Sequence, residues 1–373
     1  MKNVVLVFEI TTDSHWMKDV VQFPSALAKR SNGEAYIITR KNNEQSELKK
    51  HINLFYLGRD SNNRFNSDLS SIKISHWWYL RACIEAASLG EILVLYPFFG
   101  NPILGSILFR LSRLLRLKKG QVVIKTDGFL QFLASRKSLL LKTLANLNFP
   151  FFNQIICEND TIYKTVLSDY PNLSKKLVYI PNCPISLYHN TPNNISYKER
   201  PKNFLFVGRI SDKEKGGDIL LNTWLHIAKK LPDWKLVLVG VSSNVFKKEW
   251  EKQLSTNNLT ESVVWINGLS PDKLKEQYNT SRIVVCSSRK ESGPIVLGEA
   301  GLSGCAFIGT NVGEIPTMLN GLPGLVNNVE HFAETMLLFA NDSFLAEQQA
   351  KNLYNRTKSR NWQEQVKNVK ISD

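Results

Sequence analysis

Residues 204–217 read FLFVGRISDKEKGG, an apolar run followed by a polar loop and two glycines. The apolar run predicts a buried β-strand, and the glycines predict a tight turn into the helical pattern that comes next. The same order of a short β-rich run and a longer helical pattern recurs along the whole chain. This alternation indicates parallel sheets with crossover helices, which is an α/β fold.

The expected strands fall into two groups. They lie at 4–8, 35–38, 92–95, 122–125, 155–157 and 178–180 in the first half, and at 204–207, 235–239, 263–266, 283–286 and 306–308 in the second. Helical patterns are clearest at 20–30, 77–88, 218–231, 272–278 and 295–303.

A stretch with several prolines and asparagines and no periodicity separates the two halves. We expect two doubly wound, Rossmann-like domains that face a central cleft, with ligands beyond the carboxyl ends of the strands. The predicted boundaries are 1–182 for the first domain, 183–200 for a linker and 201–355 for the second domain. A C-terminal helix at 356–373 is expected to pack back on the first domain.

Composition narrows the class of protein. The 373 residues carry a formal net charge of +14, which favours an anionic partner such as a nucleic acid, a membrane surface or a phosphorylated substrate. The balance of residues excludes disorder, collagen and coiled coil. Five scattered cysteines without a C-x-x-C pair fit a reducing cytosol. The first residues do not resemble a signal peptide, and Pro97 and Pro102 interrupt the apolar stretch 92–109, so we expect a soluble or peripheral protein.

Two segments contain candidate residues for binding an anion. Arg209 and Lys215 follow the strand at 204–207, where a loop can bring both cations to one phosphate, although a solvated basic turn would have the same sequence. The segment SSRKESGPIVLGEAGLSG, 287–304, follows the strand at 283–286. Pro294 marks the expected start of a helix, and the free backbone amides of such a start suit an anion. Glu299 lies about one turn further, where it can accept hydrogen bonds from vicinal hydroxyls. The alternative is a capped surface helix with solvated acids.

These segments belong to a longer series of motifs. In order they are V-G-R-x5-K-G, L-V-G, I-N-G-L-S, S-S-R-x-E-S-G-P-I-V-L-G-E-A and T-N-V-G-E-I-P. Over 204–318 their order and spacing resemble the donor-binding half of family 4 retaining glycosyltransferases (group 1 glycosyltransferases), which have the GT-B fold. The first half resembles the family more weakly, at 4–8, 122–128 and 178–182.

The resemblance implies a role for each matching residue. Arg209 and Lys215 would hold the donor diphosphate together with the backbone amides around Gly293, Ile295 and Val296. Glu299 would bind the ribose, and Gly268 and Leu269 would line the base pocket. Glu291 would lie beside the transferred sugar as a catalytic residue. Departure of a nucleoside diphosphate builds negative charge, which fixed cations and amides stabilise.

The chain departs from the family pattern at three places. Gly293-Pro294 stands where an aromatic residue and a glycine are usual, so one backbone donor is missing. Thr11–His15 replaces the usual glycine pair, and Asp127 replaces a histidine. The candidate residues on the acceptor side therefore differ from those usual in the family. Asp127 is either a second catalytic residue or a turn former. Asp13 and His15 are acceptor-side candidates, with simple exposure as the alternative for His15.

The sequence contains no D-x-D triplet and no clustered His/Cys pattern. We therefore expect no cofactor and no metal, with Arg209 and Lys215 supplying the charge that a metal ion would otherwise provide.

Positive charge is concentrated between residues 101 and 145, where nine cations accompany the single acid Asp127. In ILGSILFRLSRLLRLKKG the arginines recur every three residues among leucines and isoleucines, which predicts a basic amphipathic helix. Such helices bind anionic membrane surfaces, and 104–119 and 135–152 are the candidate segments. A core-packed helix with a basic outer face is the alternative. Nucleic-acid binding is not expected, because no nucleic-acid module accompanies the patch.

Together these features predict a retaining, metal-independent hexosyltransferase-type enzyme that uses a nucleotide sugar and a carbohydrate acceptor. The acceptor is expected to be lipid-linked, in bacterial surface polysaccharide synthesis at the cytoplasmic face of the cell membrane. The alternatives are a GT-B nucleotide-sugar epimerase and a non-catalytic nucleotide-sugar or lipid-binding scaffold.

Overall fold

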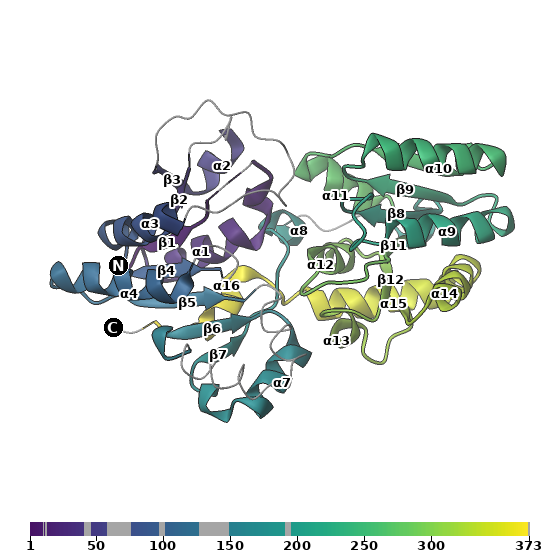
Figure 1. Ribbon diagram of the computed structural model, residues 1–373. Coiled ribbons are helices and arrows are strands. Elements are labelled where there is room, and N and C mark those ends of the chain that lie inside the picture. Colours follow the sequence, from purple (N-terminus) through teal and green to yellow (C-terminus); the bar gives the residue numbers. More distant parts are fainter. Residues whose placement is uncertain are drawn as a thin grey trace. The chain divides into compact units, whose positions relative to one another are not determined.

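The structure, a computed structural model, describes residues 1–9, 11, 13–40, 46–57, 76–96, 101–126, 149–190 and 195–371. The chain divides into two compact units (Figure 1). The first is Met1–Asn182 together with Trp362–Asp373, and the second is Cys183–Asn361.

The first unit is built on a sheet of seven parallel strands in the order β3-β2-β1-β4-β5-β6-β7. The strands are β1 Val4–Val7, β2 Ala35–Thr39, β3 Asn53–Tyr56, β4 Ile92–Leu95, β5 Gln121–Lys125, β6 Gln154–Cys157 and β7 Leu177–Tyr179. The longer helices are α1 Asp19–Arg30, α2 Ser46–His51, α3 His76–Leu89, α4 Pro102–Leu115 and α7 Asp160–Asp169. Short helical turns are η1 Asp13–Met17, η3 Phe149–Phe151, η4 Pro171–Leu173, α16 Trp362–Gln365 and η8 Val366–Asn368.

The second unit is built on a sheet of six parallel strands in the order β10-β9-β8-β11-β12-β13. The strands are β8 Asn203–Val207, β9 Lys235–Val239, β10 Val263–Ile266, β11 Ile283–Cys286, β12 Ala306–Thr310 and β13 Leu325–Val326. The longer helices are α9 Gly217–Ile227, α10 Asn244–Thr256, α11 Pro271–Asn279, α12 Ile295–Leu302, α14 Val329–Asn341 and α15 Ser343–Thr357. The shorter ones are α8 Ser186–Asn190, η5 Tyr197–Glu199, η6 Ala228–Lys230, η7 Thr260–Ser262 and α13 Ile315–Leu319.

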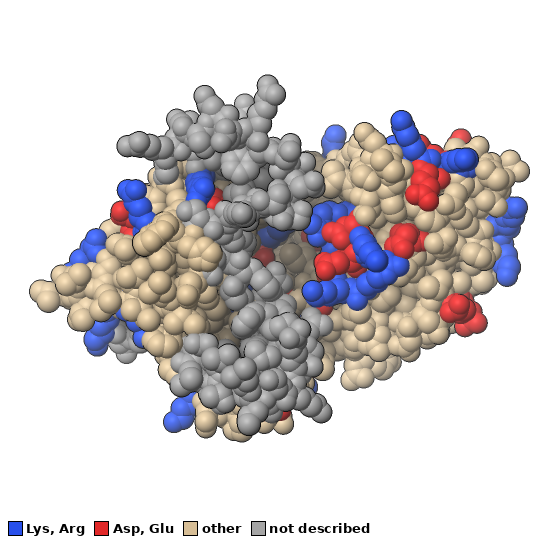
Figure 2. Space-filling model, viewed as in Figure 1, with Lys and Arg blue, Asp and Glu red and all other residues tan. Residues whose placement is uncertain are grey.

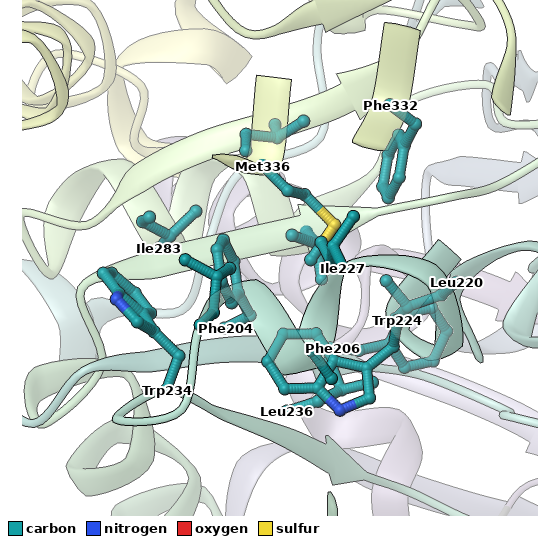
Figure 3. Packing of buried hydrophobic residues seen from close by; sticks show 14 of the residues in the cluster. Phe204, Phe206, Leu220, Trp224, Ile227, Trp234, Leu236, Ile283, Phe332 and Met336 are labelled. Atoms are coloured by element: carbon teal, nitrogen blue, oxygen red, sulfur yellow. The ribbon is translucent and has the colours of Figure 1, made fainter. Parts of the chain in front are cut away.

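Large aromatic side chains fill the core of the second unit (Figure 3). Phe204 of β8 lies between the rings of Trp224 and Trp234, with ring centroids 5.9 Å and 4.7 Å away. Both faces of the central strands are covered, which is why β8 and β11 are continuous apolar runs and not alternating ones. The prediction of two doubly wound α/β units is confirmed.

Two strands, β3 and β13, lie outside the apolar runs expected from the sequence. β3 lies at the edge of its sheet and its ends are exposed, so its composition gives no continuous apolar run. β13 has only two residues, which is too short for a pattern.

The structure draws the domain boundaries differently from the prediction. Residues 183–200 are part of the second unit and include α8 and η5, so they do not form a separate linker. The buried side chain of Arg200 fixes this segment by donating to the carbonyl groups of Ser281 and Gly304, at 3.2 and 2.9 Å.

The last residues of the chain belong to the first unit, and the change of unit lies after Asn361 instead of at 355. Two side chains of the first unit hold this segment. Arg30 donates to the carbonyl of Val369 at 2.5 Å, and Gln121 donates to the carbonyl of Lys370 at 2.5 Å.

The apolar stretch 92–109 forms strand β4 and most of helix α4, as the interrupting prolines predict. Within the described ranges, no helix combines the length and the apolar character that crossing a bilayer requires. All five cysteines are buried.

The strand order locates the expected ligand site of each sheet. In the second unit the order reverses between β8 and β11, because β9 and β10 lie on one side and β12 and β13 on the other. Ligands of doubly wound sheets bind at such a switch point, beyond the carboxyl ends of the strands.

Candidate active site

A lysine and a glutamate meet at the switch point between β8 and β11. Lys215 lies in the loop after β8, and Glu291 lies in the loop after β11. The Lys215 Nζ is 2.6 Å from Glu291 Oε1, and the hydroxyl of Ser288 donates to the same oxygen at 2.7 Å. The fold thus brings together two residues that are 76 positions apart and that the motifs had singled out separately.

Backbone contact between the two loops requires glycine. Gly216 has φ +67°, and a Cβ added to it would lie 2.1 Å from the carbonyl oxygen of Ser287. The Ser287 hydroxyl donates to the carbonyl of Gly216 at 2.8 Å. Since any side chain at 216 would force the loops apart, this glycine sets the distance between Lys215 and Glu291.

An arginine that the sequence analysis did not single out joins the same two loops. Arg289 forms a bidentate pair with Asp218, with both N–O distances 2.7 Å. Its backbone amide donates to the carbonyl of Glu214 at 2.7 Å, and its guanidinium donates to the carbonyl of Lys213 at 2.9 Å. The hydrogen bond from Arg289 holds the pKa of Asp218 below its usual value. Because the pair is partly exposed, we expect it to add little to the free energy of unfolding. Its main effect is to fix the positions of the two loops.

The end of β12 and the loop after it support the Glu291 loop. Thr310 donates to the carbonyl of Ser288 at 2.5 Å, and the amide of Glu314 donates to the carbonyl of Ser292 at 2.9 Å. Glu314 is itself buried and pairs with Arg360 at 3.1 Å. The two hydrogen bonds fix the backbone at Ser288 and Ser292, on either side of Glu291 in the chain.

Arg209 is not paired with the glutamate. Its guanidinium is mostly exposed and lies 2.8 Å from Asp212 in its own loop. Both cations predicted to bind phosphate are thus matched with a carboxylate. Figure 2 shows basic and acidic side chains side by side on the face of the second unit. An incoming anion would have to compete with those carboxylates for Arg209 and Lys215.

The predicted amide cradle lies at the start of α12. Pro294 is the residue before the helix and offers no side-chain acceptor to its amides. Helix amides in the first turn have no partner within the helix, so those of Ile295 and Val296 suit an anion. Gly293 lies directly before Pro294, at the same helix start.

Glu299 lies deeper than the sequence analysis suggested. Its side chain is buried, and the hydroxyl of Tyr278 donates to Glu299 Oε2 at 2.7 Å. Burial raises the pKa of Glu299 from 4.5 to about 7, and the hydrogen bond from Tyr278 opposes this rise.

This raised pKa predicts a pH-dependent stability. Between about pH 4.5 and pH 7 the folded chain binds a proton at Glu299 that the unfolded chain has released, so the free energy of unfolding should fall as pH rises through that window. Urea unfolding at pH 5 and pH 7.5 should show a smaller fall for Glu299→Gln than for the parent. The control is Glu330→Gln, an exposed glutamate in α14 of the same unit. A Glu299→Gln profile parallel to that of the parent would contradict the prediction.

Gly268 and Leu269 follow β10, the edge strand of the sheet. Gly268 is exposed with φ +24°, and a Cβ there would have no atom within 4 Å. Leu269 is half-buried. The two residues are thus at the carboxyl edge of the sheet, with open space at Gly268.

The acceptor-side candidates lie in the first unit. Asp13 and His15 are in η1, and the ring of His15 contacts that of Phe8 edge-on with centroids 5.3 Å apart. Asp127 lies outside the described residues, as do 135–148 of the second candidate membrane segment.

A buried ionic cluster in the first unit was not predicted. Lys125, one of the nine cations between residues 101 and 145, is fully buried, and its Nζ lies 2.7 Å from Asp19 and 2.5 Å from Glu158. Tyr96 donates to Asp19 at 2.6 Å. Lys125 therefore joins the carboxyl ends of β4, β5 and β6 to α1 and adds nothing to the surface charge.

Comparison with known proteins finds a family match in the second unit. Residues 201–342 match the family described as "Glycosyl transferases group 1". Over this range the chain is therefore similar to group 1 glycosyltransferases. The predicted resemblance is confirmed at this level, and Arg209, Lys215, Glu291 and Glu299 all lie within the matched residues.

Curated relatives cover the chain only in part. An "Uncharacterized glycosyltransferase" of Haemophilus influenzae is 29% identical over 156 residues, which are 40% of this chain and 43% of that protein. An "Uncharacterized 41.2 kDa protein in cps region" of Klebsiella pneumoniae is 32% identical over 129 residues, 34% of this chain and 33% of that protein. The chain thus spans less than half of the length of either relative.

Solved structures match the chain along nearly its whole length. HepE of Anabaena in complex with UDP and glucose has a TM-score of 0.70 at 14% identity, covering 98% of both chains. Sucrose-phosphate synthase of Thermosynechococcus elongatus has a TM-score of 0.70 at 17% identity, covering 98% of this chain and 96% of that one. At this identity the likeness concerns the fold, and it confirms the predicted GT-B fold class.

Proposed function

We propose that the protein is a glycosyltransferase that moves a sugar from a nucleotide-sugar donor to a carbohydrate acceptor. The observation that carries this proposal is the Lys215–Glu291 pair at the switch point of a group 1 glycosyltransferase domain. The HepE structures contain UDP and UDP-glucose, which supports a nucleotide sugar as the donor.

In this proposal the donor diphosphate displaces the carboxylates that now pair with the cations. Lys215 leaves Glu291, and Arg209 leaves Asp212, to bind phosphate oxygens beside the amides of Ile295 and Val296. As the bond between the sugar and the diphosphate breaks, these groups stabilise the charge that develops on the leaving group. Once the donor is bound, these groups are in position, so little further reorganisation is needed while the bond breaks.

Released from Lys215, the carboxylate of Glu291 lies at the sugar end, where positive charge develops on the ring carbon. Glu299 is assigned to the ribose, and Gly268 and Leu269 to the base. The acceptor hydroxyl attacks on the same face that the diphosphate leaves and gives its proton to the departing diphosphate oxygen, so the anomeric configuration is retained. Asp127, Asp13 and His15 remain candidates for the acceptor side.

The acceptor in this proposal is a lipid-linked carbohydrate at the cytoplasmic face of a bacterial cell membrane. A relative named for a cps region supports surface polysaccharide synthesis as the process. The enzyme would be peripheral, with the membrane contact made by the first unit.

The test is a panel of nucleotide sugars, scored by thermal-shift stabilisation and by slow hydrolysis of the donor. One donor should stabilise the protein and release its nucleoside diphosphate. With an acceptor, NMR of the product should show the donor's anomeric configuration. Conversion to an epimeric sugar without acceptor would favour the epimerase. Binding without any turnover would favour the scaffold.

We also expect activity without a divalent metal, because two cations and the helix amides can neutralise the diphosphate. Activity after prolonged chelation with EDTA should equal that of the untreated protein. A control titration with Mg²⁺ and Mn²⁺ should leave the rate unchanged within a factor of about two. Strict dependence on either ion would contradict the proposed charge stabilisation.

A further inference from the structure

Helix α4 buries several polar residues beside Phe109. The hydroxyl of Ser106 donates to the carbonyl of Phe151 at 2.7 Å, and that of Ser112 donates to the carbonyl of Ile84 at 3.4 Å. Arg113, only 3% exposed, donates to the carbonyl of Ala87 and forms an ion pair with Glu91 at 3.1 Å. The inner face of this helix thus carries two serines and an arginine together with the fully buried Phe109.

Leucines occupy the outer face of the same helix. Positions 104, 108, 111 and 115 follow one another at helical spacing, and three of these four residues are exposed. Exposure rises toward the helix end, with fractions of 51% at Leu111, 66% at Leu114, 86% at Leu115 and 94% at Leu117. The outer face thus carries leucines together with the exposed Arg116, whereas Arg113, which the sequence pattern groups with the other arginines of a basic face, is buried.

Leu117 is in an unfavourable backbone conformation. It follows the end of α4 with φ +55°, a region that glycine or asparagine occupies more readily. Its side chain is almost fully exposed and so adds nothing to the core. Packing within the unit therefore does not account for a leucine at this position.

The charge around these leucines indicates which partner. Arg116, Lys118 and Lys119 are exposed beside them, and residues 101–126 contain no aspartate or glutamate. A second copy of this chain would place like charges opposite one another. An anionic lipid surface would instead complement the cations while its acyl region accepts the leucines.

We propose that Leu111, Leu114, Leu115 and Leu117, here called the leucine face, insert into an anionic lipid bilayer. Arg116, Lys118 and Lys119 contact the head groups around them. The inference deepens the proposed function, because it rests on a lipid-linked acceptor for its biological purpose. Insertion of leucines, and not charge alone, is the main source of the binding.

The test is sedimentation of the full chain with vesicles of phosphatidylglycerol and phosphatidylcholine. The parent should bind, and a variant with all four leucines of the leucine face changed to serine should bind at least tenfold more weakly. These side chains are exposed, so the variant should keep its melting temperature. The matched control changes the exposed Leu338 and Phe344 of the second unit to serine and should bind like the parent.

A second variant separates insertion from charge. Changing Arg116, Lys118 and Lys119 to glutamine should weaken binding to anionic vesicles in low salt. The parent should keep part of its binding in 0.5 M NaCl, because salt screens the attraction between charges but not the insertion of leucines into the bilayer. Absence of vesicle binding, or equal binding by the parent and the leucine variant, would overturn the proposal. If the parent and the glutamine variant form a dimer and the leucine variant does not, the leucine face binds a second copy of the chain and the proposal is wrong.

The outcome is independent of the enzymatic proposal. Nucleoside diphosphate binding by the leucine variant should equal that of the parent, because the donor site lies in the other unit. Vesicle binding without any nucleotide-sugar binding would leave the leucine face established and the proposed glycosyl transfer refuted.

Discussion

Replacing Lys215 with alanine is expected to weaken nucleoside diphosphate binding about 10- to 100-fold and to lower turnover by a similar or larger factor. The substitution removes a charge-assisted hydrogen bond worth about 1.5–3 kcal/mol. It also leaves Glu291 without the cation that lies 2.6 Å away, so repulsion between that carboxylate and the diphosphate adds to the loss. Isothermal titration with the free diphosphate measures the first effect, and steady-state kinetics measures the second.

The matched control is Lys213→Ala, an exposed lysine in the same loop, which should keep the parent affinity. Arg209→Ala should weaken binding less than Lys215→Ala, because Arg209 is more exposed. If Lys215→Ala binds the diphosphate as tightly as Lys213→Ala does, the diphosphate is not bound at the switch point.

Replacing Glu291 with glutamine is expected to lower turnover about 100- to 1,000-fold, the loss typical of removing one electrostatic contact to a transition state. Glutamine preserves the shape and can still accept the hydrogen bond from Ser288, so the loss would come from the missing charge. Donor affinity should be equal or higher, since Lys215 no longer has a competing carboxylate. A fall in kcat with little change in donor Kd is the expected signature.

Glu214→Gln, an exposed glutamate in the neighbouring loop, serves as the control and should retain the parent rate. An unchanged kcat in Glu291→Gln would exclude this residue from the chemical step. A rise in donor Kd at constant kcat would instead place it in ground-state binding.

Much of the fold follows from local sequence. Strands such as β8 and β11 are short apolar runs because both of their faces are covered. Such a run can be recognised in the sequence without knowing which strands lie next to it. β3 was not predicted because an edge strand has exposed positions that blur the apolar signal. Residues 183–200 belong to the second unit because Arg200 bonds to Ser281 and Gly304. These partners lie far along the chain, so the local sequence does not predict the contact.

In the candidate site, too, some residues were predictable from local motifs and others were not. Arg209, Lys215 and Glu291 were recognised because each belongs to a motif with its own spacing. The clamp from Arg289 to Asp218 was not, because it joins positions 71 residues apart and neither residue is unusual where it stands. An aspartate in the first turn of a helix was the one available signal, and it is common for helix stability alone.

The orientation of α4 shows a limit of periodicity. Leucines and arginines at intervals of three and four residues define two faces, but the pattern does not say which face meets the sheet. Glu91 and the carbonyl of Ala87 decide the matter by giving Arg113 polar partners inside the unit.

The buried cysteines give each unit its own reporter of unfolding. Cys83 and Cys157 lie in the first unit, and Cys183, Cys286 and Cys305 lie in the second. Burial raises the pKa of Cys83 to about 12 and those of Cys286 and Cys305 to about 11, so few thiolates form in the native state. An alkylating reagent should therefore modify these thiols only when a unit opens. Mass spectrometry of the labelled peptides would then give separate opening rates for the two units in the intact, unmutated chain.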